Sequence, residues 1–419
     1  MKASESVKNY PSKLRESTNY ALRNIKSICK NIGPRAPGSE NEKKAQEFLA
    51  NELNSCCDAV SIEEFPVHTG AFLSWVPICS ILMIIAAVLF NAGLSYISLA
   101  LTIVCIIFVV GEFVLYKPLL DPLFPKKTSS NVIGIRQPSS ELKQRIIFSG
   151  HCDSSQEWTF NHLGGAKLLI GVIVTSVIGF VLGIIFPAVA IVKGYGFSPA
   201  IFPFDETLLK IFGYVFLAFI PFLIFASFFC NPKVTVMGAN DDLTGSLASV
   251  AVAKFMQIND IRFENTEVRI LISGSEEEGL RGAKDYCKKH LQESLEIDTV
   301  FISTDTLKDL DKIAVYNRDL SGSVKHCVKT CALLRQGGLN AGVDLPFQSL
   351  FFGASDSAAF TQAGISAATL AAMDPGPPRY YHTRRDTAEL LDLKSLETGL
   401  NILLETAFLF DEQGLKESY

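Results

Sequence analysis

The stretch SEEEGLRG at 275–282 follows a short apolar run at 268–272 and precedes a segment of helical character at 283–290. A short apolar run bounded by polar residues indicates a buried strand. Consecutive carboxylates therefore stand at the carboxyl end of a strand, where open α/β sheets place their binding sites. Because neighbouring side chains there point in different directions, one glutamate could bind a metal while another moves protons. A solvated acidic loop is the alternative for the glutamates taken alone.

Other potential metal ligands occupy similar places along the chain. His151, Asp241, Asp305 and His382 each follow an apolar run or lie in a polar loop. With a glutamate from 275–282 they make, in chain order, a His, an Asp, a Glu, an Asp and a His. Such a set suits two borderline cations that share a bridging carboxylate, each with a histidine and one further carboxylate. The sequence therefore predicts a metal site.

The chain resembles the co-catalytic zinc exopeptidases of the leucyl aminopeptidase and glutamate carboxypeptidase type. The resemblance rests on five motifs in this order: H-x-D, N-D-D-x-x-G, E-E-x-G-L-R-G, D and Y-H-T. The resemblance covers roughly residues 30–72, 128–165 and 232–412. It implies a three-layer α/β sandwich with a mixed, mostly parallel sheet. Strands that alternate with helices agree with this architecture.

The resemblance also implies a ligand set. One zinc ion would take His151, Asp241 and Asp305. The other would take Asp241, Glu277 and His382, so that Asp241 bridges the two ions. Two Zn²⁺ are therefore the expected cofactors, although the same ligands could hold other divalent transition metals such as cobalt or manganese.

Neighbours of these ligands complete the implied site. Glu276 would be the general base, and Asp153 would hydrogen-bond His151 to orient it. Tyr381 matches the tyrosine that stabilises the oxyanion in the carboxypeptidase branch. Asp242 would follow the bridging ligand through a strained or cis peptide bond.

The turn-rich stretch GPRAPGSENEKKA at 33–45 also resembles the start of this family. Within it, Ser39 and Glu42 form a capping-box signature for the helix that follows. Because the segment is structural in the family, we expect no chemistry from it.

Four apolar runs interrupt the motifs. Each has about twenty residues or more, enough to cross a hydrocarbon core of about 30 Å. The runs form two pairs, 72–90 with 94–115 and 168–192 with 208–229. We expect four inserted transmembrane helices in two hairpins, and the alternative is buried helices of a soluble protein. Glu112, near the end of the second run, is either an interfacial residue or a functional intramembrane carboxylate.

The expected organisation is thus a catalytic domain interrupted twice. Its parts are 1–70, 118–166 and 232–419, and the hairpins are 71–117 and 167–231. An even number of crossings would place all catalytic parts on one side. Lysine and arginine are more frequent in the flanks on that side, which predicts a multi-pass protein with its catalytic domain in the cytoplasm. The first forty residues contain no apolar core of signal-peptide length.

Composition narrows the function classes. The net charge of −5 gives no reason to expect a nucleic-acid partner. The ten cysteines show no metal-binding C-x-x-C spacing, so we expect mostly reduced thiols. The expected partners are a peptide or acyl-amino-acid substrate and the lipid bilayer, and a homo-oligomer remains open.

The leading interpretation is a membrane-bound zinc exopeptidase, most simply an aminopeptidase. One alternative is a zinc hydrolase of N-acyl or lipid-linked amides at the membrane surface. Glutaminyl cyclisation and a non-catalytic receptor are the less favoured alternatives, because cyclases of this type generally use one zinc ion and such receptors lose ligands.

Overall fold

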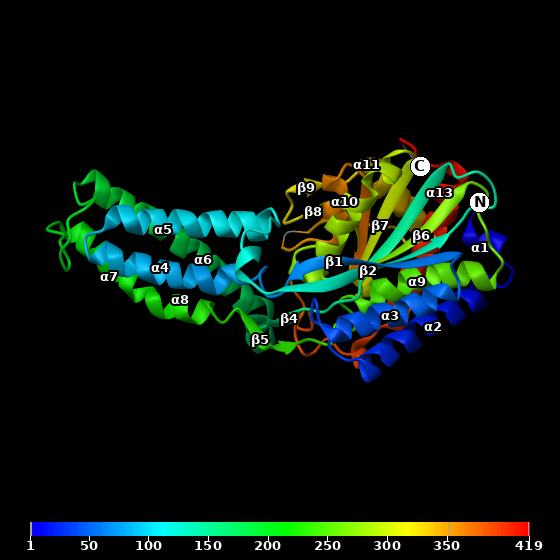
Figure 1. The fold of residues 1–419 in the computed structure, drawn as a ribbon, viewed down its shortest axis with the longest axis horizontal. Helices are drawn as coiled ribbons and strands as arrows, with labels where there is room; N and C mark the ends of the chain where they lie inside the picture. Colours follow the sequence, from blue (N-terminus) through cyan, green and yellow to red (C-terminus); the bar gives the residue numbers. More distant parts are fainter. Residues whose placement is uncertain (1, 351, 418) are drawn as a thin grey trace. The chain divides into compact units, whose positions relative to one another are not determined.

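The computed structural model describes residues 2–350, 352–417 and 419. The chain divides into two compact units, each with its own hydrophobic core. Unit 1 comprises Met1–Thr69, Lys126–Gln156 and Val234–Tyr419, and unit 2 comprises Gly70–Pro125 and Glu157–Lys233. Figure 1 shows the elements of both units.

Unit 1 is built on a mixed sheet that has nine strands in the described part of the chain. The strand order is β1-β2-β6-β3-β7-β11-β8-β10, with β9 paired to β8. The four central strands, β6, β3, β7 and β11, run parallel to one another. The strands are β1 (Ala59–His68), β2 (Lys126–Arg136), β3 (Gln144–His151), β6 (Thr266–Ser273), β7 (Asp298–Leu307), β8 (Ile313–Asp319), β9 (Val324–Lys325), β10 (Phe347–Ser349) and β11 (Ser366–Ala372).

Helices cover both faces of this sheet. On one face α2, α3, α9, α11 and α13 contribute to the main hydrophobic core. On the other face Phe301 of β7 stacks on Phe360 of α12, which in turn stacks on Tyr286 of α10. The helices of unit 1 are α1 (Ala3–Ser6), α2 (Tyr10–Asn31), α3 (Glu40–Asn54), α9 (Leu243–Ile258), α10 (Arg281–Leu295), α11 (Val328–Asn340), α12 (Asp356–Gln362) and α13 (Leu393–Gln413). The predicted three-layer α/β class is confirmed.

The central strands explain why site residues gather at one edge. β3 is buried at every position after Gln144, and β6 is buried at every position, as expected for strands covered on both faces. In register, His151 at the end of β3 pairs with Ser273 at the end of β6. Ser149 of β3 pairs with Ser303 of β7, two residues before Asp305. The loops after these strands therefore leave the sheet side by side.

Unit 2 consists mainly of apolar helices. It contains α4 (Trp75–Asn91), α5 (Ser95–Phe108) with its π-helical extension Val109–Val114, α6 (Thr159–Val192), α7 (Thr207–Ala218) and α8 (Ile220–Ala226). The chain passes between the units on β4 (Gln156–Trp158) and β5 (Cys230–Thr235), which form a two-stranded sheet. In the core of unit 2, Phe90 packs against Phe204, Phe186 and Phe216.

Within the described residues, three helices are long and apolar enough to cross a membrane: Ser95–Val114, Thr159–Val192 and Thr207–Ala226. Three of the four expected helices therefore reach this length, and the helix formed by the first apolar run is shorter. The first apolar run forms α4, which has 17 residues because residues 72–74 belong to the preceding turn. At 1.5 Å per residue α4 is about 25 Å long, which is shorter than a hydrocarbon core of about 30 Å.

The structure gives Glu112 a local partner. It lies in the π-helical extension of α5 and is 1% exposed. Its Oε1 accepts a hydrogen bond of 2.6 Å from the backbone N–H of Leu120. The carboxylate thereby ties the segment that follows the helix back onto the helix end.

Candidate metal centre

The predicted ligands come from loops that follow neighbouring strands. His151 ends β3, and the glutamates lie in a single 3₁₀ turn, Glu276–Glu278, just after β6. Asp305 lies near the end of β7, and Asp241 directly precedes the N-cap of α9. His382 comes from the loop after β11, where its φ of 51° is in the left-handed region.

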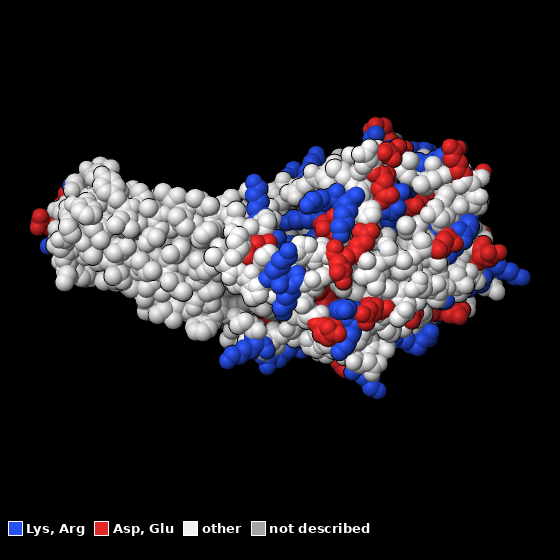
Figure 2. Space-filling view, viewed as in Figure 1, with Lys and Arg blue, Asp and Glu red and all other residues white. Residues whose placement is uncertain are grey.

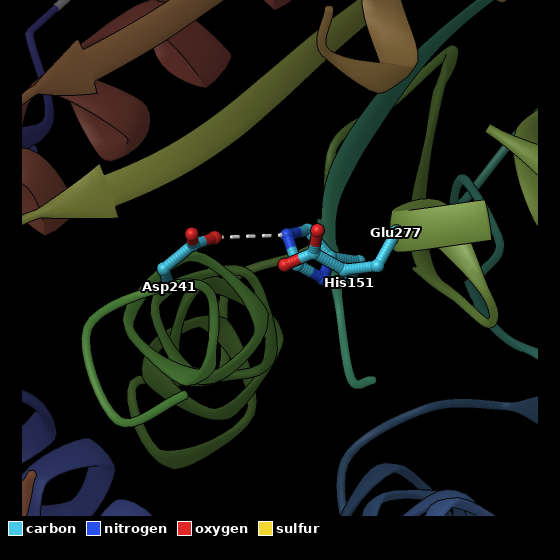
Figure 3. Close-up of side chains that lie close together, drawn as sticks. All are labelled: His151, Asp241 and Glu277. Carbon is cyan, nitrogen blue, oxygen red and sulfur yellow. Dashed lines mark ion pairs between the residues drawn. The ribbon is translucent and has the colours of Figure 1, made fainter. Parts of the chain in front are cut away.

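Asp241 lies between the two histidines. His151 Nε2 is 3.2 Å from Asp241 Oδ1, and His382 Nε2 is 3.0 Å from Asp241 Oδ2. His382 Nε2 is also 3.2 Å from Glu277 Oε1. Figure 3 shows Asp241 and Glu277 approaching His151 from different elements. One carboxylate thus faces two imidazoles with its two oxygens, as a bridging ligand would.

Two overlapping groups of side chains could hold a cation. Ligand atoms of His151, Asp241 and Glu277 lie within 4.8 Å of one another, and so do those of His151, Asp242 and Asp305. With His382, whose Nε2 lies 3.0 Å from Asp241 Oδ2, all five predicted ligands lie in one largely buried cluster.

The nitrogen and oxygen atoms of the cluster are better arranged for binding a metal ion than for hydrogen-bonding one another. Asp241 Oδ2 and Glu277 Oε1 are buried and have no hydrogen bond of acceptable geometry, although His382 Nε2 is close to both. Buried carboxylate oxygens without a donor are costly. Borderline cations such as Zn²⁺ accept this mixture of imidazole nitrogen and carboxylate oxygen. The residues present therefore fit the metal that the motifs imply.

Asp153 connects the histidine loop to the glutamates. Its Oδ1 accepts a hydrogen bond from the Glu276 N–H and its Oδ2 accepts one from the Glu277 N–H, both at 3.0 Å. Its Oδ1 also lies 3.4 Å from His151 Nδ1. The sequence predicted a hydrogen bond between Asp153 and His151, and the structure brings the two groups close without a hydrogen bond of acceptable geometry at His151 Nδ1. The sequence missed the two backbone bonds, which fix the loop that carries both glutamates.

Asp242 has a different environment from Asp241, to which it is joined by a cis peptide bond. Its Oδ1 accepts hydrogen bonds from the N–H groups of Gly245 and Thr306, and its Oδ2 accepts one from His151 N–H. These three bonds join the start of α9 to the ends of β3 and β7. We therefore assign Asp242 to holding the loops together, and Asp241 to the ligand position.

Glu276 is close to the cluster but not central to it. Its Oε2 is 3.9 Å from His151 Nε2, and the residue is 9% exposed. Burial raises the pKa of Glu276 well above its usual value, although the nearby His151 opposes this effect. A carboxyl group with a raised pKa binds a proton more strongly, which suits a group that takes up a proton and returns it.

Tyr381 is held by its neighbour. Its ring stacks on the imidazole of His382 with 3.9 Å between ring centres. Its hydroxyl lies close to Gly353, at 3.9 Å from the position that a Cβ atom would have on that glycine. The structure thus places the Tyr381 hydroxyl beside the loop that precedes α12.

Burial and mutual repulsion change the protonation of the metal-free cluster. Burial and the Asp241 carboxylate raise the pKa of Asp305 to about 7. Burial alone would lower the pKa of His382, but the carboxylates of Glu277 and Asp241 raise it to about 10. A bound cation would therefore compete with protons at these two groups.

Two supporting residues in the segment 33–45 were not expected to contact the site loops. The guanidinium of Arg35 is completely buried and donates to four backbone carbonyls, those of Gly33, Cys152, Met237 and Gly238. It thereby fixes the loops that precede Asp153 and Asp241. An arginine between two prolines and two glycines gave no sign of this role, because its partners are backbone atoms far away in sequence.

Glu42 extends the capping signature that was predicted for it. Its N–H donates to Ser39 Oγ, as in a capping box, and its Oε2 accepts from Gly38 N–H. Its Oε1 accepts from the N–H and hydroxyl of Ser275, directly before the glutamates. Burial and the nearby Asp153 raise the pKa of Glu42 to about 8.

Asp386 supports the bridging ligand directly, and the sequence did not single it out. One of its oxygens accepts from the backbone and side-chain amides of Asn240, and the other accepts from Asp241 N–H at 3.0 Å. The closing loop after His382 thus holds the loop of Asp241 in place.

Comparisons with known proteins agree with this arrangement. Residues 225–407 match the family model described as Peptidase family M28. No match was found among curated protein sequences. Two similar solved structures are a zinc aminopeptidase from Bacillus subtilis and an aminopeptidase from Aneurinibacillus sp. strain AM-1. The first has 15% identity and a TM-score of 0.58, covering 93% of this chain and 94% of that chain.

The second has 14% identity and a TM-score of 0.55, with coverage of 94% and 95%. A glutaminyl cyclase from Fimbriiglobus ruber is also similar, with 14% identity, a TM-score of 0.54 and coverage of 94% and 95%. These likenesses describe the fold, and the family model describes the segment that carries four of the five ligand positions. Residues 225–407 therefore form a Peptidase family M28 region, and the chain has the fold of the similar zinc aminopeptidase structures.

Proposed function

We propose that the chain is a membrane-bound aminopeptidase that removes amino-terminal residues from peptides and holds two zinc ions. The observation that carries the proposal is the position of Asp241, whose two oxygens face the Nε2 atoms of His151 and His382. A single carboxylate between two imidazoles is suited to two cations rather than one.

The five ligands divide into two sets around this carboxylate. His151 and Asp305 would complete one set, and Glu277 and His382 would complete the other. When bound, zinc lowers the pKa of a coordinated water and polarises the scissile carbonyl. Asp153 and Asp386 hold the loops that carry these ligands in place by accepting hydrogen bonds from backbone N–H groups.

Glu276 has the properties of the proton carrier. It lies at the edge of the cluster, 3.9 Å from His151 Nε2, and Glu277 beside it fills the ligand role. As a carboxylate, Glu276 takes a proton from the attacking water. It then returns that proton to the amide nitrogen, which leaves as a neutral amine when the C–N bond breaks. Neither step consumes a proton overall.

Tyr381 is the candidate for stabilising the oxyanion. Its ring stacks on the imidazole of His382, which restricts the movement of the side chain that carries the hydroxyl. A hydroxyl donor held in advance stabilises developing negative charge more than a mobile one does. The bridging set and the Tyr381 hydroxyl together favour amide hydrolysis.

Glutaminyl cyclisation is the second candidate, because glutaminyl cyclases are among the similar structures. Cyclases of this type generally use one zinc ion, and this chain offers both sets of ligands. Aminopeptidase names among the similar structures also support the first candidate.

We further propose that the apolar helices of unit 2 anchor the enzyme in a lipid bilayer and that unit 1 faces the cytoplasm. Three helices of sufficient length support the anchoring. The lysines and arginines that flank the apolar runs support the orientation. N-acyl or lipid-linked amides are the alternative substrates if the membrane helices take part in substrate binding.

The test is digestion of a mixed peptide library by the detergent-purified full chain, followed by mass spectrometry. Stepwise loss of amino-terminal residues in the wild type but not in Glu276→Ala supports an aminopeptidase. Ring closure of amino-terminal glutamine without shortening supports the cyclase. No change in any peptide by a protein that carries zinc would contradict both.

A further inference from the structure

His382 is held on the side of its ring that faces away from the carboxylates. Its Nε2 faces Asp241 and Glu277 at 3.0 and 3.2 Å. Its Nδ1 lies 3.1 Å from the hydroxyl oxygen of Ser155, which is 3% exposed. One imidazole thus has a ligand face and a support face, and the support comes from a different loop.

The chemistry of the ring fixes the direction of this bond. When Nε2 gives its lone pair to a cation, the single ring proton of neutral imidazole is on Nδ1. Nδ1–H then donates to Ser155 Oγ. A partner at this position selects the tautomer and the ring orientation that a metal requires.

Ser155 belongs to the segment on which the chain leaves unit 1. It is followed by Gln156, the last residue of that unit in its middle segment. The Ser155 carbonyl accepts a hydrogen bond of 2.9 Å from the N–H of Val236, on the segment where the chain returns. The Ser154 hydroxyl donates to the Val236 carbonyl, also at 2.9 Å. The outgoing and returning segments are therefore fastened to each other.

The hydrogen bonds between these two segments lie close in sequence to the candidate metal ligands. Ser155 follows His151 by a few residues, and Val236 precedes Asp241 by a similar number. Arg35 strengthens the arrangement, because its N–H donates to Ser154 Oγ and its guanidinium donates to the carbonyls of Cys152 and Met237. The segment that carries Ser155 is therefore held rigidly where it meets His382.

We propose that Ser155 is a positioning residue for His382, so that the connection between the catalytic unit and the second apolar hairpin forms part of the metal centre. The proposal rests on the proposed metal-dependent function and concerns the ion that His382 and Glu277 share. Ser155 makes no contact with substrate in this role. It acts by keeping the His382 imidazole in the ligating orientation.

The test measures zinc affinity of the detergent-purified full chain by chelator competition, independently of any peptide substrate. In Ser155→Ala, we expect one of the two ions to bind about 10 to 100 times more weakly, the range found for losing the support of a ligating histidine. Ser155→Thr keeps the hydroxyl and should restore most of the affinity. Ser154→Ala is the matched control, because it removes a neighbouring hydroxyl that touches Val236 and Arg35 but no histidine.

A second arm separates the effect on His382 from general loosening. In a His382→Ala background, Ser155→Ala should leave the affinity of the remaining ion unchanged, because its target ring is gone. The visible spectrum of cobalt-loaded Ser155→Ala should differ from that of the wild type, whereas that of Ser154→Ala should not.

Each outcome decides something. Equal zinc affinity in the wild type and Ser155→Ala would overturn the positioning role while leaving the metal site intact. So would an equal loss in Ser154→Ala, or a loss that persists in the His382→Ala background. A wild-type chain that binds no zinc would instead defeat the proposed function itself.

Discussion

The two units bury and expose side chains in opposite ways. Unit 1 buries ionisable groups, among them Asp241, Asp242 and His382. Unit 2 exposes apolar ones, such as Val177 at 55% and Ile201 at 89%. In Figure 2 the surface of unit 2 is almost entirely white, whereas unit 1 shows many blue and red side chains.

Exposed apolar surface and buried charge are both unfavourable in water, and each is stabilised by a different environment. Extended apolar surface is stable when lipid replaces water around it. Buried like charges are stable when a cation neutralises them, because an unpaired buried carboxylate costs several kcal/mol. The comparison teaches that the two units need opposite surroundings, a positive charge beside the carboxylates of unit 1 and an apolar solvent around the helices of unit 2, and each need can be tested by substitution.

The largest effect is expected at the proton carrier. Glu276→Gln should lower kcat by about 10² to 10⁴, the usual contribution of a general base, while both zinc ions remain bound. The measurement is peptide hydrolysis beside metal content. Glu278→Gln, in the same 3₁₀ turn, is the matched control and should lose much less. Equal losses in the two variants would contradict the assignment of Glu276.

A pair of lysine substitutions tests the contrast between the units. Val177 of α6 and Leu295 of α10 are similarly exposed, at 55% and 57%. Val177→Lys, near the middle of α6, should cost about 2.5–3.5 kcal/mol if lipid surrounds it. Leu295→Lys should change stability by less than about 0.5 kcal/mol, because water surrounds it.

Alkaline extraction of membranes and melting in detergent would measure both lysine variants. Similar behaviour of Val177→Lys and Leu295→Lys would show that α6 is not in a bilayer.

Removing the charge on Asp153 tests how unit 1 holds its glutamates. Asp153→Asn should weaken zinc binding about 10- to 100-fold, because one amide oxygen cannot accept from both Glu276 and Glu277 N–H groups while facing His151. Metal competition assays would detect this loss. An affinity like that of the wild type would show that the loop needs no such support.

The smallest effect is the dependence of zinc affinity on pH. In the metal-free protein the carboxylates raise the pKa of His382 to about 10, so its ring is protonated at neutral pH. Zinc must displace that proton, and affinity at this position should therefore rise about tenfold for each pH unit between 6 and 9. Calorimetry in buffers of different ionisation enthalpy would count the released protons. A flat affinity over this range would contradict the described cluster.

The sequence brought the candidate ligands together because most of them stand at strand ends. His151, Glu277 and Asp305 follow buried strands, and parallel strands bring such ends to one edge. The order of the strands did not follow from the sequence, since β6 lies between β2 and β3 although it comes later in the chain. Long-range pairing of this kind leaves no local pattern.

The supporting residues were harder to predict than the ligands. Arg35 and Asp153 act on backbone atoms, and a backbone partner has no residue type that a motif could show. The length of the first apolar helix was overestimated from the sequence. Hydrophobicity continues through residues 72–74, but hydrogen bonding of the preceding turn delays the start of α4 to Trp75.

Metal content is the most direct test of the central claim, that Asp241 joins two metal ions in the buried cluster of unit 1. Plasma mass spectrometry of the detergent-purified full chain, after dialysis, would count the ions in the wild type and in Asp241→Asn. The account predicts two zinc ions per chain in the wild type and loss of both in the variant. One zinc ion or none in the wild type, or an unchanged content in Asp241→Asn, would contradict it.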